Sequence, residues 1–412
     1  MPPTTPTTKS TPSEPVYTRR ERFDPVGELR ALAGRGPVTR VEVGDGSHST
    51  AVWLVTGYAE VRQVLGDHVR FSTRRRPGLT SPGRDGGAPS GDRRPGELVG
   101  HLMDYDPPEH TRLRQLLTPE FTVRRIRRLE PRIHAIVTER LDVMERTGPP
   151  ADLVASFASP VPGAVLCELI GVPRDDRDGF LRGCHAFLAE GRGRQRRAAF
   201  GESMSRYLGA MVARARKDPD DGFLGALVRD HGDDITDEEL RGVCVLLILA
   251  GLDNVSGMLG LGALMLLEHP EQLALVRDDD GAVDGAVDEL LRYLTVPHAP
   301  TPRTALADVT VGEQLIKAGE HVICSLPLAN RDTALLAEPD RFDITRESTA
   351  HVAFGHGVHY CLGAALSRAE LRIAYPALLH RFPRLRLAVP EPEVTFRVHA
   401  RAHGVERLPV AW

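Results

Sequence analysis

Residues 351–370 read HVAFGHGVHYCLGAALSRAE, a glycine-rich loop that runs through a cysteine into an apolar helix pattern. Gly355 and Gly357 permit backbone conformations and close approaches that a side chain would block. After the cysteine, an apolar stripe at helical spacing is formed by Leu362, Leu366, Ala369 and Ile373. Cys361 therefore lies where a loop enters a helix, and the N–H groups and dipole there favour the thiolate over the thiol.

The residues alone leave three interpretations of Cys361 open. A buried structural cysteine is the default for a single cysteine. A nucleophile partnered by His359 is the second, because helix N-termini also activate cysteines. The third is a thiolate ligand of haem iron, since a glycine-lined loop lets the backbone approach a flat macrocycle.

The pattern Phe354-Gly355-x-Gly357-x-His359-x-Cys361-x-Gly363 fixes six positions within ten residues and resembles the haem-binding loop of the cytochrome P450 family. The resemblance covers about Phe23 to Trp412 and is greatest to the soluble bacterial class of actinomycete secondary metabolism. It implies that the loop binds haem b and that Cys361 ligates the iron. It also implies a mainly α fold with minor β-structure, with a long central helix over the haem and small sheets at one side.

Further marks of the family follow along the chain. Glu289-x-x-Arg292 resembles the ExxR pair, whose members face one another on a helix, with Arg341 in EPDRF as the expected third partner. The segments DPPEHTRLR (106–114) and ILAGLDN (248–254) resemble the entry to the C-helix and the oxygen groove. Buried propionates require basic partners, and the resemblance assigns them to His110, Arg114, Arg303 and His359, with His351 also placed near the haem.

The apolar segment 242–267 is expected to form the central helix, and its single charged residue is Asp253. The segment is long enough to cross a bilayer, but an aspartate at mid-span costs about 2.5–3.5 kcal/mol on insertion. We therefore expect a buried helix, which begins after the capping box Thr236-x-x-Glu239. By resemblance, the small residues Ala250 and Gly251 let the helix kink and admit oxygen above the iron.

Asp253 and Asn254 are the candidate catalytic residues. Asp253 is expected to relay protons to bound oxygen; the alternative is a helix-distorting residue with a local salt-bridge partner. The next position is commonly threonine in the family, whereas Asn254 offers no hydroxyl for a relay. Three explanations remain open: Asn254 holds a water, a substrate hydroxyl supplies the proton, or the reaction is not simple hydroxylation.

Composition excludes several other classes of protein. The 412 residues are 41% hydrophobic, and a net charge of 52 − 56 = −4 disfavours a nucleic-acid binder. The five cysteines form no CxxC pair, which disfavours a disulfide scaffold or zinc cluster and favours the cytoplasm. Helical patterns fill most of residues 106–295, and strands are indicated by WLVTG, VTVG and HVICSL.

The chain is expected to form one domain. We predict a disordered tail over residues 1–18 and a single cytochrome P450 domain over residues 19–412. The loop 74–97 and the turn 191–197 are expected to gate the pocket, although plain disorder explains the loop equally well.

The resemblance implies oxygen-dependent oxidation of a small hydrophobic or aromatic natural product, by hydroxylation or a related oxidation. The alternative is oxidative C–C, C–N or aryl coupling without oxygen insertion. Two different classes of protein also stay open. One is a non-catalytic recruitment domain, which loss of the cysteine would mark, and the second is a thiol hydrolase that uses Cys361 and His359.

Electrons are expected from a ferredoxin and its reductase, and no nucleic-acid or membrane partner is expected. The basic cluster in FTVRRIRRLEPR follows the C-helix segment and is either a solvated face or the surface on which an acidic ferredoxin docks. Its members are Arg124, Arg125, Arg127 and Arg128.

Overall fold

The computed structural model describes residues 15–44, 49–74, 99–188, 194–297, 302–347, 350–397 and 402–412. The predicted gating segments lie outside these residues, apart from Arg74 and the helical backbone of residues 194–197. The disordered tail was predicted over residues 1–18, but its last residues, 16–18, form a 3-10 helix. Val16 and Tyr17 pack against an apolar cluster that includes Leu29 and Leu54, and this contact orders them.

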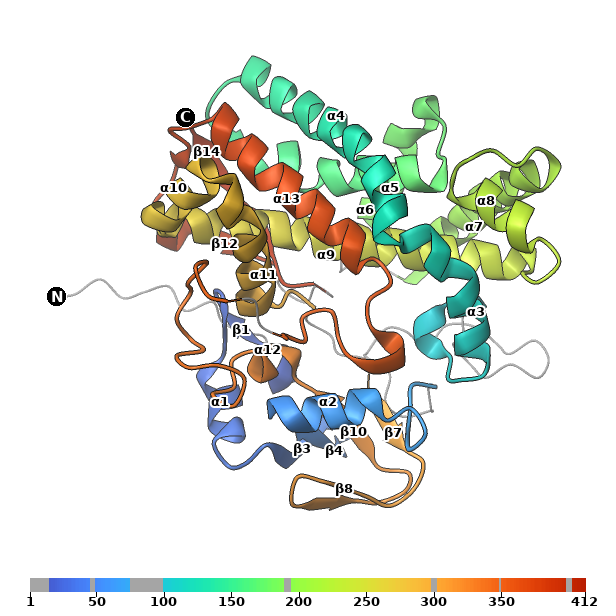
Figure 1. Cartoon of the computed structure of the whole chain (residues 1–412), viewed down its shortest axis with the longest axis vertical. Helices are drawn as coiled ribbons and strands as arrows, with labels where there is room; N and C mark the ends of the chain where they lie inside the picture. Colours follow the sequence, from blue (N-terminus) through green and yellow to red (C-terminus); the bar gives the residue numbers. More distant parts are fainter. Residues whose placement is uncertain are drawn as a thin grey trace.

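Helices form most of the molecule, as predicted, and Figure 1 shows the long helices α4, α9 and α13 away from the sheet of β3, β4, β10 and β7, while β12 and β14 lie beside α10. The helices are α1 (Gly27–Ala33), α2 (Tyr58–Gly66), α3 (Glu109–Leu117), α4 (Val123–Thr147), α5 (Pro160–Ile170), α6 (Arg177–Leu188), α7 (Arg194–Lys217), α8 (Phe223–His231), α9 (Asp237–Glu268), α10 (Pro270–Asp278), α11 (Val283–Leu294), α12 (Leu326–Ala329) and α13 (Ala364–Arg381).

The strands are short and form several small sheets. They are β1 (Arg20–Glu21), β2 (Asp24–Pro25), β3 (Val38–Gly44), β4 (Ser49–Val55), β5 (Phe71–Ser72), β6 (Ala151–Asp152), β7 (Arg303–Ala305), β8 (Val309–Val311), β9 (Gln314–Ile316), β10 (His321–Cys324), β11 (Arg386–Leu387), β12 (Thr395–Phe396), β13 (Val405–Arg407) and β14 (Pro409–Ala411). The largest sheet has the order β3-β4-β10-β7-β5, and only its β4–β10 pair is parallel. A turn at Gly312 joins β8 to β9.

The helical pattern expected over residues 106–295 is interrupted after α3. A 3-10 helix, Thr118–Phe121, separates α3 from α4. Pro119 has no N–H to donate to the preceding turn, so an α-helix cannot continue through it without losing a hydrogen bond. The break turns the chain between the two helices (Figure 1).

The long apolar helix α9 has 32 residues and begins with the predicted capping box, in which Thr236 and Glu239 each accept a backbone N–H of the other. It is apolar enough to pass for a membrane span, but 56% of its most apolar window is buried inside the fold. It contacts α5, α7 and α13, so it is the central core helix that the sequence predicts.

Two apolar clusters meet on α9. From Val255 to Leu266 the helix packs into a cluster with α4, α11 and α13, which we call the α13 cluster. From Leu240 to Leu252 it packs into a second cluster with α3, α7 and α8, the α7 cluster. Asp253 and Asn254 lie between the two.

Candidate active site

The cysteine loop is seated on the end of α2. Gly357 has φ +73°, and a Cβ there would lie 2.4 Å from the carbonyl oxygen of Leu65. Only glycine fits this close approach. Gly355 has φ +75°, and the loop is closed by a 2.9 Å hydrogen bond from the Cys361 N–H to the Phe354 carbonyl.

Cys361 is half-buried and differs from the other cysteines of the chain, Cys167, Cys184, Cys244 and Cys324, which are all buried. Burial raises the pKa of each of those four thiols to about 12, so they are inert. Burial also raises the pKa of Cys361, although the Gly363 N–H and the charges of Arg114 and Arg368 oppose that rise. The loop therefore favours the thiolate less than the sequence suggests, and a metal cation bound to Cys361 would supply the missing stabilisation.

Two buried histidines lie together beside the loop. The rings of His110, on α3, and His359 are 4.2 Å apart between centroids. Both ring nitrogens of His110 and Nδ1 of His359 are buried and have no hydrogen-bond partner within the described chain. Burial lowers their pKa values, to about 4 for His110 and about 3 for His359. Unsatisfied buried donors of this kind fit the carboxylates of a haem.

Arg114 and Arg303 lie near the two histidines, and the positive charge of each adds to burial in lowering the pKa of His359. Arg114 donates to the carbonyl oxygen of Tyr360 at 2.6 Å and so touches the loop next to Cys361. Arg303 is 5% exposed, at the start of β7, and burial lowers its pKa. The four predicted propionate partners are therefore brought together from α3, β7 and the cysteine loop.

His351 does not join this cluster. Its Nε2 lies 3.8 Å from Asp288 Oδ1 on α11, and its Nδ1 accepts the Ala353 N–H. The prediction that His351 lies near the haem stays a prediction. Arg368 lies over the Phe354 ring at 4.6 Å and also pairs with Asp288.

The Glu289–Arg292 pair is buried, with two hydrogen bonds of 2.6 and 2.8 Å. Arg292 also donates to the carbonyl oxygens of Asn330 and Pro339, each at 2.8 Å. The predicted third partner, Arg341, meets the pair only through its carbonyl oxygen, which accepts from Arg292 at 3.4 Å. Its side chain is exposed and faces Glu338 and Asp343. Arg346 approaches instead, with its Nε 3.5 Å from Glu289.

Asn330 extends this network to the cysteine loop. Its side-chain oxygen accepts the N–H of Val352 at 2.7 Å, and its amide donates to Thr295 at 2.8 Å. Because Asn330 is fully buried, these bonds are shielded from water. The pair on α11 thus braces the loop through one buried amide.

The middle of α9 carries the other candidates. Ala250 is exposed, and its carbonyl oxygen accepts the side-chain N–H of Asn254 at 2.8 Å. Gly251 was expected to open the helix, but a Cβ there would meet Leu166 of α5 at 3.0 Å. Its small size therefore serves the packing of α5 on α9, and α9 continues through it.

Asp253 has a distant partner that the sequence does not reveal. Its Oδ1 lies 2.8 Å from Nη1 of Arg397, which also donates to Ser256 at 3.1 Å. Arg397 follows β12 and is separated from Asp253 by 144 residues. The alternative of a helix-distorting residue with a local partner holds only in that Asp253 has an ion-pair partner: the partner is distant, and α9 continues through Asp253. Nothing in the sequence around Arg397 signals this role.

The basic cluster on α4 is divided. Arg124, Arg127 and Arg128 are exposed. Arg125 is half-buried and pairs with Glu120 at 3.0 Å while donating to the Asp221 carbonyl at 2.7 Å. Arg124, Arg127 and Arg128 therefore form an exposed basic surface, whereas Arg125 holds the start of α4 against Glu120 and Asp221.

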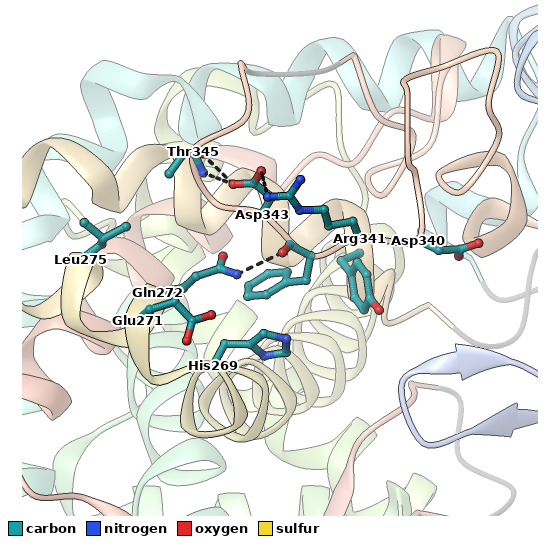
Figure 2. A pocket seen from close by; sticks show the side chains of 10 residues that line it. His269, Glu271, Gln272, Leu275, Asp340, Arg341, Asp343 and Thr345 are labelled. Carbon is teal, nitrogen blue, oxygen red and sulfur yellow. Dashed lines mark hydrogen bonds and ion pairs between the residues drawn. The ribbon is translucent and has the colours of Figure 1, made fainter.

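A pocket of ≈ 590 Å³ lies elsewhere, between α10, the end of α11 and residues 340–345 (Figure 2). Gln272 donates to the Phe342 carbonyl at 3.0 Å and accepts the Ile344 N–H at 2.9 Å. Figure 2 draws the first of these two hydrogen bonds, from the Gln272 side chain, as a dashed line. Apart from Arg341, no predicted site residue lines the pocket, and its contacts hold residues 340–345 against α10.

Comparisons with known proteins agree with this geometry. Residues 209–393 match the model of the family described as Cytochrome P450. Cytochrome P450 165B3 of Amycolatopsis orientalis is 56% identical over 97% of this chain and 98% of its own length. The solved structure of P450 StaH from glycopeptide antibiotic A47934 biosynthesis is 62% identical, with a TM-score of 0.88 over 97% of this chain and 100% of that one.

Two further structures are similar over nearly the whole chain. OxyB from teicoplanin biosynthesis, solved in complex with the X-domain, is 61% identical, with a TM-score of 0.88 and coverage of 97% and 100%. OxyC, described as implicated in an oxidative C–C coupling reaction during vancomycin biosynthesis, is 46% identical, with a TM-score of 0.87 and coverage of 97% of both chains. The predicted fold and cofactor are confirmed. The chain belongs to the cytochrome P450 family, enzymes whose haem iron is held by a cysteine.

Proposed function

We propose that this enzyme joins aromatic side chains of a peptide by oxidative coupling, in the biosynthesis of a glycopeptide antibiotic. The observation that carries the proposal is Asn254, whose amide is bonded to Ala250 where a relay hydroxyl would serve oxygen insertion. The similarity to OxyC and StaH supports it. Hydroxylation, the main expectation from the sequence, is less well supported than this alternative.

In a coupling, two phenolic rings each lose one hydrogen and a new bond joins them. Molecular oxygen, two electrons and two protons then yield two waters, so no oxygen atom enters the product. Bound haem supplies the oxidising chemistry. The chain supplies the cysteine ligand Cys361, a partly buried ion pair at Asp253–Arg397, and Asn254, whose side-chain N–H donates to the helix backbone.

The propionates of the haem are held by His110, Arg114, Arg303 and His359. Their support is the buried, unsatisfied ring nitrogens of the two histidines and the two arginine charges beside them. Phe354, Gly355, Gly357 and Gly363 shape the loop, and Ala250 lines the opposite side, where α9 leaves it exposed.

Two partners follow from this function. A ferredoxin, reduced by its own reductase in the cytoplasm, docks on the exposed basic face formed by Arg124, Arg127 and Arg128. The peptide is presented by an assembly-line domain, by analogy with the complex of OxyB and the X-domain.

The experiment begins with the absorption spectrum of the reduced, carbon-monoxide-treated protein. The enzyme is then supplied with ferredoxin, its reductase and a linear peptide that carries several 4-hydroxyphenyl side chains, either free or tethered to a carrier protein beside an X-domain. Mass spectrometry is expected to show a product lighter by two hydrogens, and Cys361→Ser is expected to give none. A product heavier by one oxygen in both formats would overturn the coupling proposal.

A further inference from the structure

A third histidine, His68, is half-buried in the turn that follows α2, two residues beyond the end of that helix. Its Nδ1 is buried and has no hydrogen-bond partner among the described residues. His68 is also among the smaller causes that lower the pKa values of His110 and His359, which agrees with a position near both. Neither the motif of the cysteine loop nor the C-helix segment includes this residue.

The turn that carries His68 is fixed on both sides. Asp67 accepts the Arg70 N–H through its side chain and the Phe71 N–H through its carbonyl, each at 3.0 Å. Phe71 then begins β5, which pairs with β7 directly after Arg303. The turn therefore holds His68 between α2 and the strand that leads from a propionate partner.

The same turn is in contact with the cysteine loop. Gly357 closely approaches Leu65 and Gly66, the last residues of α2. A Cβ on Gly66 would lie 3.4 Å from the ring of His356. The chain thus brings His68 to the loop by backbone packing.

The three rings together hold four buried nitrogens that have no hydrogen-bond partner among the residues described. They are Nδ1 of His68, both nitrogens of His110, and Nδ1 of His359. The charged groups around them are mainly basic, Arg114 and Arg303, with Asp106 as the nearby acid. Buried polar atoms are rarely left unpaired, so this arrangement indicates an anionic ligand that accepts hydrogen bonds.

A single metal ion does not explain the cluster. Within the described part of the chain, no group of His, Cys, Asp or Glu is arranged to hold a metal. The unpaired nitrogens of three histidines and the basic surroundings fit a ligand that presents more than one anionic oxygen acceptor. The two carboxylates of haem satisfy that description.

We propose that His68 is a further haem-binding residue, whose ring donates a hydrogen bond from Nδ1 to a haem carboxylate beside His110 and His359. It links retention of the cofactor to the packing of α2 on the cysteine loop. The proposal rests on the family's cofactor and is independent of the coupling function.

The test measures how fast the ferric enzyme loses haem to an excess of haem-free myoglobin, followed by visible absorption. His68→Leu removes the donor, and we expect haem loss to become roughly tenfold faster, since hydrogen bonds to charged groups are among the stronger ones. His68→Asn keeps an N–H close to the place of Nδ1 and is expected to restore most of the retention. His134→Leu, at an exposed position on α4, is the matched control and is expected to change nothing.

A second arm loads each variant with haem dimethyl ester, in which both carboxylates are blocked. The difference between the parent and His68→Leu is expected to disappear with the ester, because the acceptor charge is gone. Circular dichroism of the haem-free variants verifies folding. Equal haem loss from parent and His68→Leu, or the same acceleration with haem and with its ester, would overturn the proposal.

Discussion

The cysteine loop and the middle of α9, which carry the main candidate residues, are held in place by different kinds of contact. Around Cys361, the contacts come from residues of the family's motifs: the loop glycines, Glu289 and Arg292. Around Asp253 and Asn254, they come from Arg397 and from the backbone of α9 itself. The comparison teaches that the cysteine loop is held by contacts that its motif predicts, whereas Asp253 is held by a distant residue that no motif marks.

The largest expected effect is a loss of stability when the ion pair that braces the cysteine loop is broken. Glu289→Ala leaves the Arg292 charge buried without its carboxylate, and we expect the free energy of unfolding to fall by about 3–5 kcal/mol. Denaturant unfolding of the haem-free protein and the haem content after purification measure this loss. Glu139→Ala, at an exposed position on α4, is the control. Equal midpoints for both variants would contradict the role of the pair.

In the middle of α9, Arg397→Met removes the ion-pair partner of Asp253. We expect the carbon-monoxide spectrum to persist while coupling turnover falls by roughly tenfold or more, because acid–base groups contribute at least that much when correctly held. Arg397→Lys, which keeps the charge, is expected to recover part of the rate. Unchanged turnover in Arg397→Met would mean that the ion pair serves only packing.

The basic face offers a test that bears on electron supply alone. Arg127→Glu combined with Arg128→Glu is expected to slow ferredoxin-supported turnover several-fold at low salt and to weaken its salt dependence. Peroxide-driven turnover, which needs no ferredoxin, is expected to stay the same. The matched control reverses the charges of the exposed Arg384 and Arg386 by replacing both with glutamate. An equal effect of both double variants on turnover would show that ferredoxin does not dock specifically on α4.

A smaller effect is expected from Asn254→Thr, which introduces the residue common in the family. Coupling is expected to change by no more than a few-fold, with more electrons lost to peroxide or a trace of oxygen-inserted product. The ratio of product to electrons consumed is the measurement. If that ratio and the product are both unaffected, Asn254 has no special part in proton delivery.

The smallest effect concerns Glu370 on α13, which is buried and whose Oε2 has no partner among the described residues. Burial raises its pKa from 4.5 to about 8. The folded state therefore holds a proton that the unfolded state releases, and stability falls as pH rises from about 4.5 to 8. Glu370→Gln is expected to flatten this dependence and to raise the Tm by a few degrees at pH 8. A Tm that falls at pH 8 would contradict the assignment.

Local patterns predicted much of this molecule. The cysteine loop, the capping box at Thr236 and the Glu289–Arg292 pair depend on residues close together in sequence, and each lies where it was expected. The Arg341 side chain was expected to meet that pair, but the course of residues 338–346 brings the Arg346 side chain inward instead.

Long-range contacts could not be predicted. Arg397 reaches Asp253 across 144 residues, and no periodicity or motif marks it. His68 lies in a turn whose sequence signals only the end of a helix, and its neighbours come from α3 and the cysteine loop. Arg125 resembles its exposed neighbours in sequence, yet tertiary packing pairs it with Glu120.

The boundary between the α13 and α7 clusters falls at Asp253 and Asn254 on α9. The α7 cluster includes Leu113 and Leu117 of α3, and Leu362, the residue after Cys361, packs against it. A substitution in this cluster can therefore disturb both the helix that carries His110 and Arg114 and the cysteine loop. The two polar residues at the seam are the positions on α9 where a change in one half meets the other.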